Sequence, residues 1–187
     1  MKRVSFIVAA LLVGSSSSSA GLALFSPQSQ EVPLSGEVEM DITLQSQSLA
    51  NFDSVDVVIL SEAPFSFEYS PIIYALSPSI TLGMFPLGLE VPGLPHDLYV
   101  AAANSAVAGS MGHRILLGTV TIDVVGLDIG EYEVVINSNL DSGISALGRQ
   151  GVTEPIFGRG VFNIPEPGCA LLLLAGVATL ASRRNPR

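Results

Sequence analysis

The clearest pattern in the chain is a strict alternation of apolar and polar residues over residues 36–44. Val38, Met40, Ile42 and Leu44 fall on one side, and each residue between them is acidic or threonine. Because successive side chains of a β-strand point to opposite faces, this pattern predicts a strand with one buried and one solvated face. Such a strand is typical of an antiparallel sheet that is open to water on one side.

Further strands are expected wherever short runs alternate or stay apolar between turn signals. These runs are residues 55–60, 65–69, 80–84, 98–102, 115–125, 131–136 and 157–164. Gly126 and Gly130 bound a predicted turn, because glycine accepts a positive φ, so residues 115–125 and 131–136 are expected to pair as a hairpin. Residues 101–109 are the best helical candidate, but no interior segment has convincing helical periodicity. The interior therefore predicts an all-β fold, an antiparallel jelly-roll β-sandwich over residues 24–164.

The first 23 residues have the pattern of a secretory signal peptide. Lys2 and Arg3 precede a ten-residue apolar run, which is followed by five consecutive serines. The run is too short to cross a bilayer and leads into small residues, as a signal peptidase substrate does. Cleavage after Ala20 and cleavage after Ala23 both fit, and the pattern does not choose between them. The chain is therefore expected to be exported.

The C-terminus contains a second apolar stretch, the 14 uncharged residues Cys169–Ser182. A helix of this length is about 21 Å long, which is short of the ~30 Å hydrocarbon core. It can insert with local bilayer thinning or with snorkelling arginines, and it predicts a short hydrophobic helix. Arg183, Arg184 and Arg187 are expected to stay cytoplasmic as a stop, which places the sandwich outside.

The tail resembles the PEP-CTERM sorting signal of bacterial exported proteins. The resemblance rests on Pro165, Glu166 and Pro167, the leucines of residues 171–174, and the arginine cluster. It implies that residues 165–187 are a sorting signal recognised by an exosortase, a membrane transpeptidase or protease acting near the triplet. It further implies transfer to the cell surface or to an extracellular matrix.

Charge and cysteine content exclude several function classes. All acidic residues except Glu166 lie between Leu24 and Ile164 with only three arginines, so this stretch carries a net charge of −13. Nucleic-acid binding is not expected, since phosphate contacts need basic residues. The single cysteine excludes an intramolecular disulfide framework and a Cys-rich zinc site.

No catalytic, metal or cofactor site is predicted. His96 and His113 lie in expected loops, away from any nucleophile-elbow pattern. Asn137, Asn139 and Asp141 echo the start of an EF-hand calcium loop, but the later glycine and glutamate positions do not match, and a polar hairpin turn is predicted instead. A weak calcium site elsewhere on the acidic surface is left open. The protein is not expected to be an enzyme.

The interior resembles cohesin-like modules of the carbohydrate-binding-domain superfamily. The likeness is carried by residues 36–44, by Phe67-Glu68-Tyr69-Ser70-Pro71, and by residues 117–122 followed by 130–134. It implies a nine-stranded jelly-roll sandwich that contacts a partner. The apolar run within residues 49–60 is an addition that a cohesin does not need, and Ser70 stands where an aspartate is common.

The leading prediction is an exported, non-enzymatic surface or matrix protein whose sandwich makes protein or adhesive contacts. The alternative is a carbohydrate-binding module that holds matrix polysaccharide, and a third class is a small secreted hydrolase using His96 or His113. An aromatic strip beside calcium-ordered loops would favour carbohydrate. A flat polar face with an apolar centre would favour protein.

Overall fold

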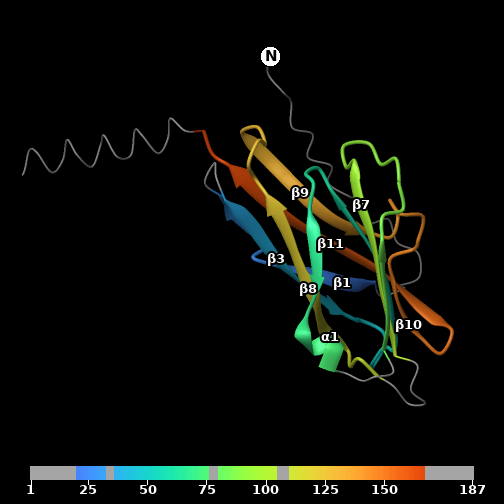
Figure 1. Ribbon diagram of the computed structural model, residues 1–187. Helices are drawn as coiled ribbons and strands as arrows, with labels where there is room; N and C mark the ends of the chain where they lie inside the picture. The colour runs from blue at the N-terminus through green and yellow to red at the C-terminus, as the bar shows by residue number, and fades with distance from the viewer. Residues whose placement is uncertain (1–19, 33–35, 76–79, 105–109, 167–187) are drawn as a thin grey trace, which may run out of the picture.

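The computed structural model describes residues 20–32, 36–75, 80–104 and 110–166. The predicted signal peptide up to residue 19, the tail helix, Pro167, Arg183, Arg184 and Arg187 lie outside these ranges. Over the described part, the chain is an all-β sandwich, as predicted (Figure 1).

The described residues form eleven strands and one short helix. In chain order they are β1 (Gly21–Ser26), β2 (Ser29–Glu31), β3 (Glu37–Gln45), β4 (Ser54–Ser61), β5 (Ser66–Tyr69), α1 (Pro71–Ala75), β6 (Ile80–Phe85), β7 (His96–Asn104), β8 (Arg114–Asp123), β9 (Gly130–Asn137), β10 (Ala146–Arg149) and β11 (Val152–Ile164). The strand order is β5-β8-β3-β1-β11-β10-β4-β7-β6, with β9 beside β11 and β4. The sheet therefore folds over on itself, and β5 and β6 are the two ends of the strand order.

Strand β11 joins the two layers of the sandwich. Its first residues pair with β10, and Phe157 to Ile164 pair antiparallel with β9. Two short neighbours, β1 and β2, run parallel to it. The expected antiparallel sandwich therefore contains two parallel pairings, and the described strands number eleven where the resemblance implied nine.

The predicted hairpin between residues 115–125 and 131–136 is also wrong. Strand β8 pairs with β3 and β5, whereas β9 pairs with β11 and β4. The turn at 126–130 exists, with positive φ at Gly126 (88°), but it carries the chain from one layer to the other. A turn signal marks where a strand ends and does not state which strand comes next to it.

Helix α1 was not predicted, because five residues are too few to show helical periodicity. The Ser70 hydroxyl accepts a hydrogen bond from the Ile73 amide at 3.4 Å, and Pro71 occupies the first helical turn. Serine at the N-cap followed by proline is a recognised helix start. Residues 101–104 of the helical candidate belong instead to β7, and 105–109 lie outside the described ranges.

The core is built from the alternating strands. Val38, Met40, Ile42 and Leu44 of β3 are completely buried between the layers, as the alternation predicts. Strand β4 is different, because the residues of its second half are buried on both faces. Val57 and Ile59 enter the main core, while their neighbours belong to a second apolar cluster on the outer side.

Candidate interaction surface

The outer surface of strands β5, β8, β3 and β1 is acidic. We call it the acidic face; its polar members are Glu37, Glu39, Asp41, Glu68, Thr119, Thr121 and Asp123. They line up across the strands, because Glu37 is paired with Asp123, and Asp41 with Thr119, at 2.7 Å between Oδ1 and Oγ1. Like charges directly opposite each other destabilise a sheet. The Glu37–Asp123 pair therefore lowers the stability of the pairing between β3 and β8, and its negative charge attracts cations.

The acidic face becomes apolar toward β1. Leu24 is paired with Thr43, which is paired with Leu116 on the other side, and Leu22 follows one row further along. Leu22 and Leu24 are 39% and 37% exposed. Both leucines belong to strand β1, and the expected boundary at residue 24 falls between them. The surface thus combines carboxylates with an apolar row on one rigid sheet.

The outer surface of the opposite layer is partly covered, while Phe85 of β6 stays exposed on it. The segment 86–95 between β6 and β7 lies over it and buries a second cluster of Val58, Leu60, Leu94 and Val135. The Asp97 carboxylate holds the start of this segment, accepting hydrogen bonds from the backbone amides of residues 87, 88 and 89 at 2.9–3.2 Å. This cover explains why the run at residues 55–60 is apolar on both faces.

Aromatic rings do not form a strip on either outer surface of the described residues. Tyr69 is buried, and Tyr132 stacks on Phe162 with centroids 5.2 Å apart. Tyr99 packs against Phe85 at 4.8 Å and donates a hydrogen bond to Asp56, and burial together with that bond raises the pKa of Tyr99 to about 12. Of this pair, Phe85 is 50% exposed and Tyr99 is half-buried.

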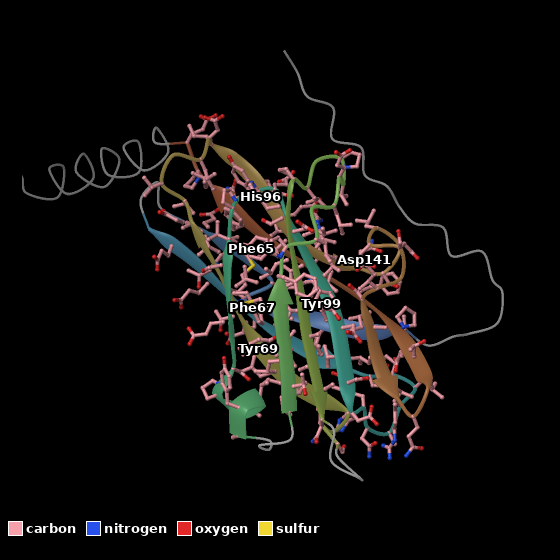
Figure 2. The ribbon with its side chains drawn as sticks, turned by 45° about the vertical axis from the view of Figure 1, so that its right-hand side comes forward. Phe65, Phe67, Tyr69, His96, Tyr99 and Asp141 are labelled. Atoms are coloured by element: carbon pink, nitrogen blue, oxygen red, sulfur yellow. The ribbon has the colours of Figure 1, made fainter. Side chains whose placement is uncertain are left out.

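Tyr69 links β5 to β6, the two end strands of the strand order (Figure 2). Its hydroxyl on β5 lies 2.7 Å from the carbonyl oxygen of Gly83 on β6 and 2.8 Å from that of Ala101 on β7. Burial raises the pKa of Tyr69 to about 12. One side chain therefore bridges the layers at the seam between β5 and β6.

A shallow hollow of about 260 Å³ opens at one end of this seam, beside Phe65 and His96. Its remaining lining residues are Pro64, Pro86, Pro95, Asp97 and Leu98. His96 is the first residue of β7 and not part of a loop as expected. None of the described residues lining the hollow is a serine or cysteine, and the Asp97 carboxylate already accepts hydrogen bonds from the amides of residues 87–89.

His113 is exposed, and its carbonyl oxygen accepts a hydrogen bond from the Ser46 amide at 2.8 Å. The two histidines are not brought into a nucleophile–histidine–carboxylate arrangement.

In the segment of the calcium candidate, the Asp141 side chain is buried although most of its neighbours are exposed. The Asp141 carboxylate is 1% exposed and accepts hydrogen bonds from the Ile144 amide at 3.0 Å and from the amide and hydroxyl of Ser145. The segment connects β9 to β10, which do not pair with each other, so it is not the hairpin turn expected. Within the described ranges, no group of three His, Cys, Asp or Glu side chains is placed to hold a metal ion.

Glu154 of β11 is a buried carboxylate that the sequence analysis did not single out. It is 1% exposed and accepts hydrogen bonds from the Ser46 and Ser48 hydroxyls and from the amides of Gln47, at 2.7 Å, and Ser48. Burial opposes its ionisation, but these hydrogen bonds prevail and lower its pKa. Its position before Pro155 gave no pattern that could have identified it.

Glu62 shows the opposite effect at the end of β4. Burial is the main reason that its pKa is raised, and the carboxylates of Glu133 and Glu131 add to the rise. Arg159 of β11 lies 2.6 Å from Glu133 and 3.5 Å from Glu131, and these are the ion pairs of the described part of the chain. This cluster is structural, because Glu62 Oε2 accepts the Glu133 amide.

Two residues of the predicted sorting motif follow β11 directly. Pro165 is half-buried and Glu166 is exposed. Among the described residues, no helix is long and apolar enough to cross a membrane.

Comparisons with known proteins place the fold. No protein-family model and no curated protein sequence matches the chain. The structure is similar to the sixth cohesin of scaffoldin B from Acetivibrio cellulolyticus, solved with a Cel5 dockerin mutant, with 15% identity and a TM-score of 0.57 over 78% of this chain and 99% of that one. A type I cohesin–dockerin complex from Clostridium thermocellum gives 12% identity, a TM-score of 0.53, and coverage of 78% and 99%. A type II cohesin from Acetivibrio cellulolyticus gives 10% identity, a TM-score of 0.50, and coverage of 77% and 94%. The chain is thus a cohesin-like β-sandwich in fold.

Proposed function

We propose that this protein is an exported, non-enzymatic interaction module that binds another protein through the acidic face. The supporting observation is the contrast between its two outer surfaces. One is partly covered by the chain's own segment 86–95, while the other exposes a row of carboxylates beside Leu22 and Leu24. A surface of this kind suits a partner with basic residues around an apolar contact.

The fold supports this proposal. Two of the similar structures are cohesins solved together with dockerins, so sandwiches of this shape serve as protein-binding modules. Identities of 12% and 15% do not carry the dockerin partner over to this chain. The chemistry of the partner is therefore inferred from the acidic face itself.

Export and sorting complete the proposal. A signal peptidase removes the N-terminal segment, the apolar tail holds the protein in the membrane at least transiently, and an exosortase acts near Pro165, Glu166 and Pro167. The product then reaches the cell surface or the extracellular matrix. Intact mass spectrometry of the protein from membrane and extracellular fractions of its host tests this. Loss of the first segment and of everything after the triplet is expected, whereas a mass that retains Cys169–Arg187 would contradict sorting.

Binding is tested with a charge reversal on the acidic face. In the mature protein, the double variant Glu39→Arg/Asp41→Arg is expected to lose at least tenfold in affinity for a basic partner from the host envelope, and the wild-type affinity is expected to fall with salt. Glu90→Arg, on the exposed cover of the other layer, is the matched control. Equal losses in both variants, or none in the double variant, would contradict the assigned surface.

Carbohydrate binding is the second candidate, and it rests on the Phe85–Tyr99 pair. Phe85 is 50% exposed and its ring can stack on a sugar. If matrix polysaccharide is the ligand, Phe85→Ala should abolish retention on that polysaccharide while the charge reversal leaves it intact. The opposite result supports protein binding.

A further inference from the structure

Strand β1 begins at the bond that one of the two candidate cleavage sites would break. Gly21 is its first residue and is buried. A Cβ on Gly21 would lie 3.3 Å from Leu147 Cδ1, 3.4 Å from the Gln45 oxygen and 3.5 Å from Glu154 Oε1. Close packing on three sides therefore starts at Gly21.

Cleavage after Ala23 would damage the fold. The pairing of β1 with β11 consists of Gly21 with Ile156 and Leu22 with Phe157, so all of it would be lost. Ala23 is 4% exposed, and its carbonyl oxygen is only 2.0 Å from where a Cβ of Gly158 would lie, so the two backbones are in close contact. Cleavage after Ala20 leaves every one of these interactions in place.

The same end of β1 lies next to the buried Glu154 carboxylate. The amide nitrogen of Gly21 is about 2.5 Å from the Cβ position by standard geometry, which places it within about 6 Å of Glu154 Oε1. The described ion pairs both involve Arg159, so no described cation is ion-paired with Glu154. A peptide nitrogen at residue 21 carries one proton and no charge, whereas a terminal ammonium carries three protons and a full charge.

We infer that signal peptidase hydrolyses the Ala20–Gly21 bond and that the released ammonium group of Gly21 pairs with Glu154. Water supplies the hydroxyl of the new Ala20 carboxyl group and a proton to the amine, which takes up a second proton at neutral pH. The inference rests on the proposed export and adds the processing site and a consequence for the fold. Maturation thus adds a charge-assisted hydrogen bond to a buried carboxylate.

The pairing has a definite pH dependence. Around Gly21, β11 presents Glu154 as the titratable group, β3 presents Gln45 and β10 presents Leu147. A carboxylate partner raises the amine pKa above its ordinary ~7.7–8.0. The added stability is therefore fully present below that range and is lost as pH rises through the raised pKa. Glu154 remains ionised throughout this range.

The first test is the N-terminus of the exported protein. Mass spectrometry of the mature chain is expected to show Gly21 as its first residue. A chain that starts at Leu24 would overturn the inference and leave export standing. A chain that keeps Met1 to Ala20 would contradict the proposed export itself, so the two failures are distinguishable.

The second test uses the lysine content of the chain. Lys2 is the only lysine, so a mature protein starting at Gly21 has one primary amine, its N-terminus. Acetylation at that single amine removes the charge and is expected to lower the melting temperature at pH 7 by about 3–8 °C. An unchanged melting temperature would overturn the pairing, whatever the behaviour of any variant.

Glu154→Gln is the matched comparison for the acetylation. In this variant the carboxylate is gone and the amide keeps the size of the side chain, so acetylation is expected to change its melting temperature by less than about 1 °C. An equal loss in wild type and variant would overturn the pairing. Should the variant fail to fold, the rate of amine acetylation against pH in the wild type decides: a midpoint above ~8 is expected, and an ordinary midpoint overturns the pairing.

Discussion

The two outer surfaces of the sandwich are made by strands of similar length, but one is open to solvent and the other lies partly under another segment of the chain. Strand β3 exposes every second residue, and its outer side chains are acidic or polar. Strand β4 buries Val58 and Leu60 on its outer side, under the segment 86–95. The comparison teaches that a run with apolar residues on both faces signals a cover, and that strict alternation signals a surface left open to solvent or a partner.

The largest expected effect is on the free energy of unfolding, when one leucine on each of the two surfaces is truncated to alanine. Leu60→Ala removes a completely buried side chain beneath the cover and should cost about 3 kcal/mol of unfolding free energy. Leu24→Ala on the acidic face should cost less than about 1 kcal/mol, because that side chain is 37% exposed. Urea unfolding of both variants measures the difference. Equal costs would show that the two surfaces are not distinct.

The next effect concerns the attachment of the cover. Asp97→Ala removes the acceptor of three backbone amides and should cost about 2 kcal/mol, the size of a hydrogen bond to a charged group. Hydrogen exchange should accelerate at residues 87–89 and spread to the β4 amides as the cover loosens. Asp123→Ala on the acidic face is the control, and exchange there should change only locally. Protection that persists at residues 87–89 in Asp97→Ala would contradict an anchoring role.

A smaller effect is expected at the seam. Tyr69→Phe keeps the ring but removes the hydroxyl shared between the Gly83 and Ala101 carbonyls, and should cost about 1–2 kcal/mol. Thermal unfolding measures it. Tyr74→Phe, on the exposed side of α1, should leave the free energy of unfolding unchanged. It is the control for the loss of a tyrosine hydroxyl by itself.

The smallest effect depends on pH. The hydrogen bonds to Glu154 lower its pKa below 4.5, so its ionised form stabilises the native state above that pH. This contribution is lost as pH falls through the lowered folded-state pKa. The stability advantage of wild type over Glu154→Gln should therefore amount to about 1 kcal/mol at pH 7 and shrink below pH ~4. An advantage that stays constant down to pH 3 would contradict the assignment.

Local sequence pattern predicts the open surface better than the covered one. The alternation around Met40 identifies both the buried and the exposed side of β3, because period two is a property of the strand alone. The cover over Leu60 depends on a segment about thirty residues later in the chain. The position of β9 beside β11 also depends on a partner far away in sequence, and local turn chemistry does not contain that information.

The polar anchors were harder to predict than the core. Glu154 and Asp97 resemble any surface carboxylate in sequence, and only the fold brings backbone amides to them. Asp141 sits among asparagines that suggest calcium, yet its own segment supplies the donors. A carboxylate that will be satisfied by backbone amides has no side-chain partner that spacing could reveal.

Strand β11 also determines how the sandwich responds to force. It is the last described strand, it runs into Pro165, and it is flanked along its length by β9, β1 and β2. A force applied along the axis of β11 would load the hydrogen bonds between residues 157–164 and strand β9 in shear, so that they would not open one by one. Under such a force, the rate of forced unfolding, more than equilibrium stability, sets how long the domain stays folded. Strand β11, which the sequence continues beyond Ile164, is hydrogen-bonded on both sides.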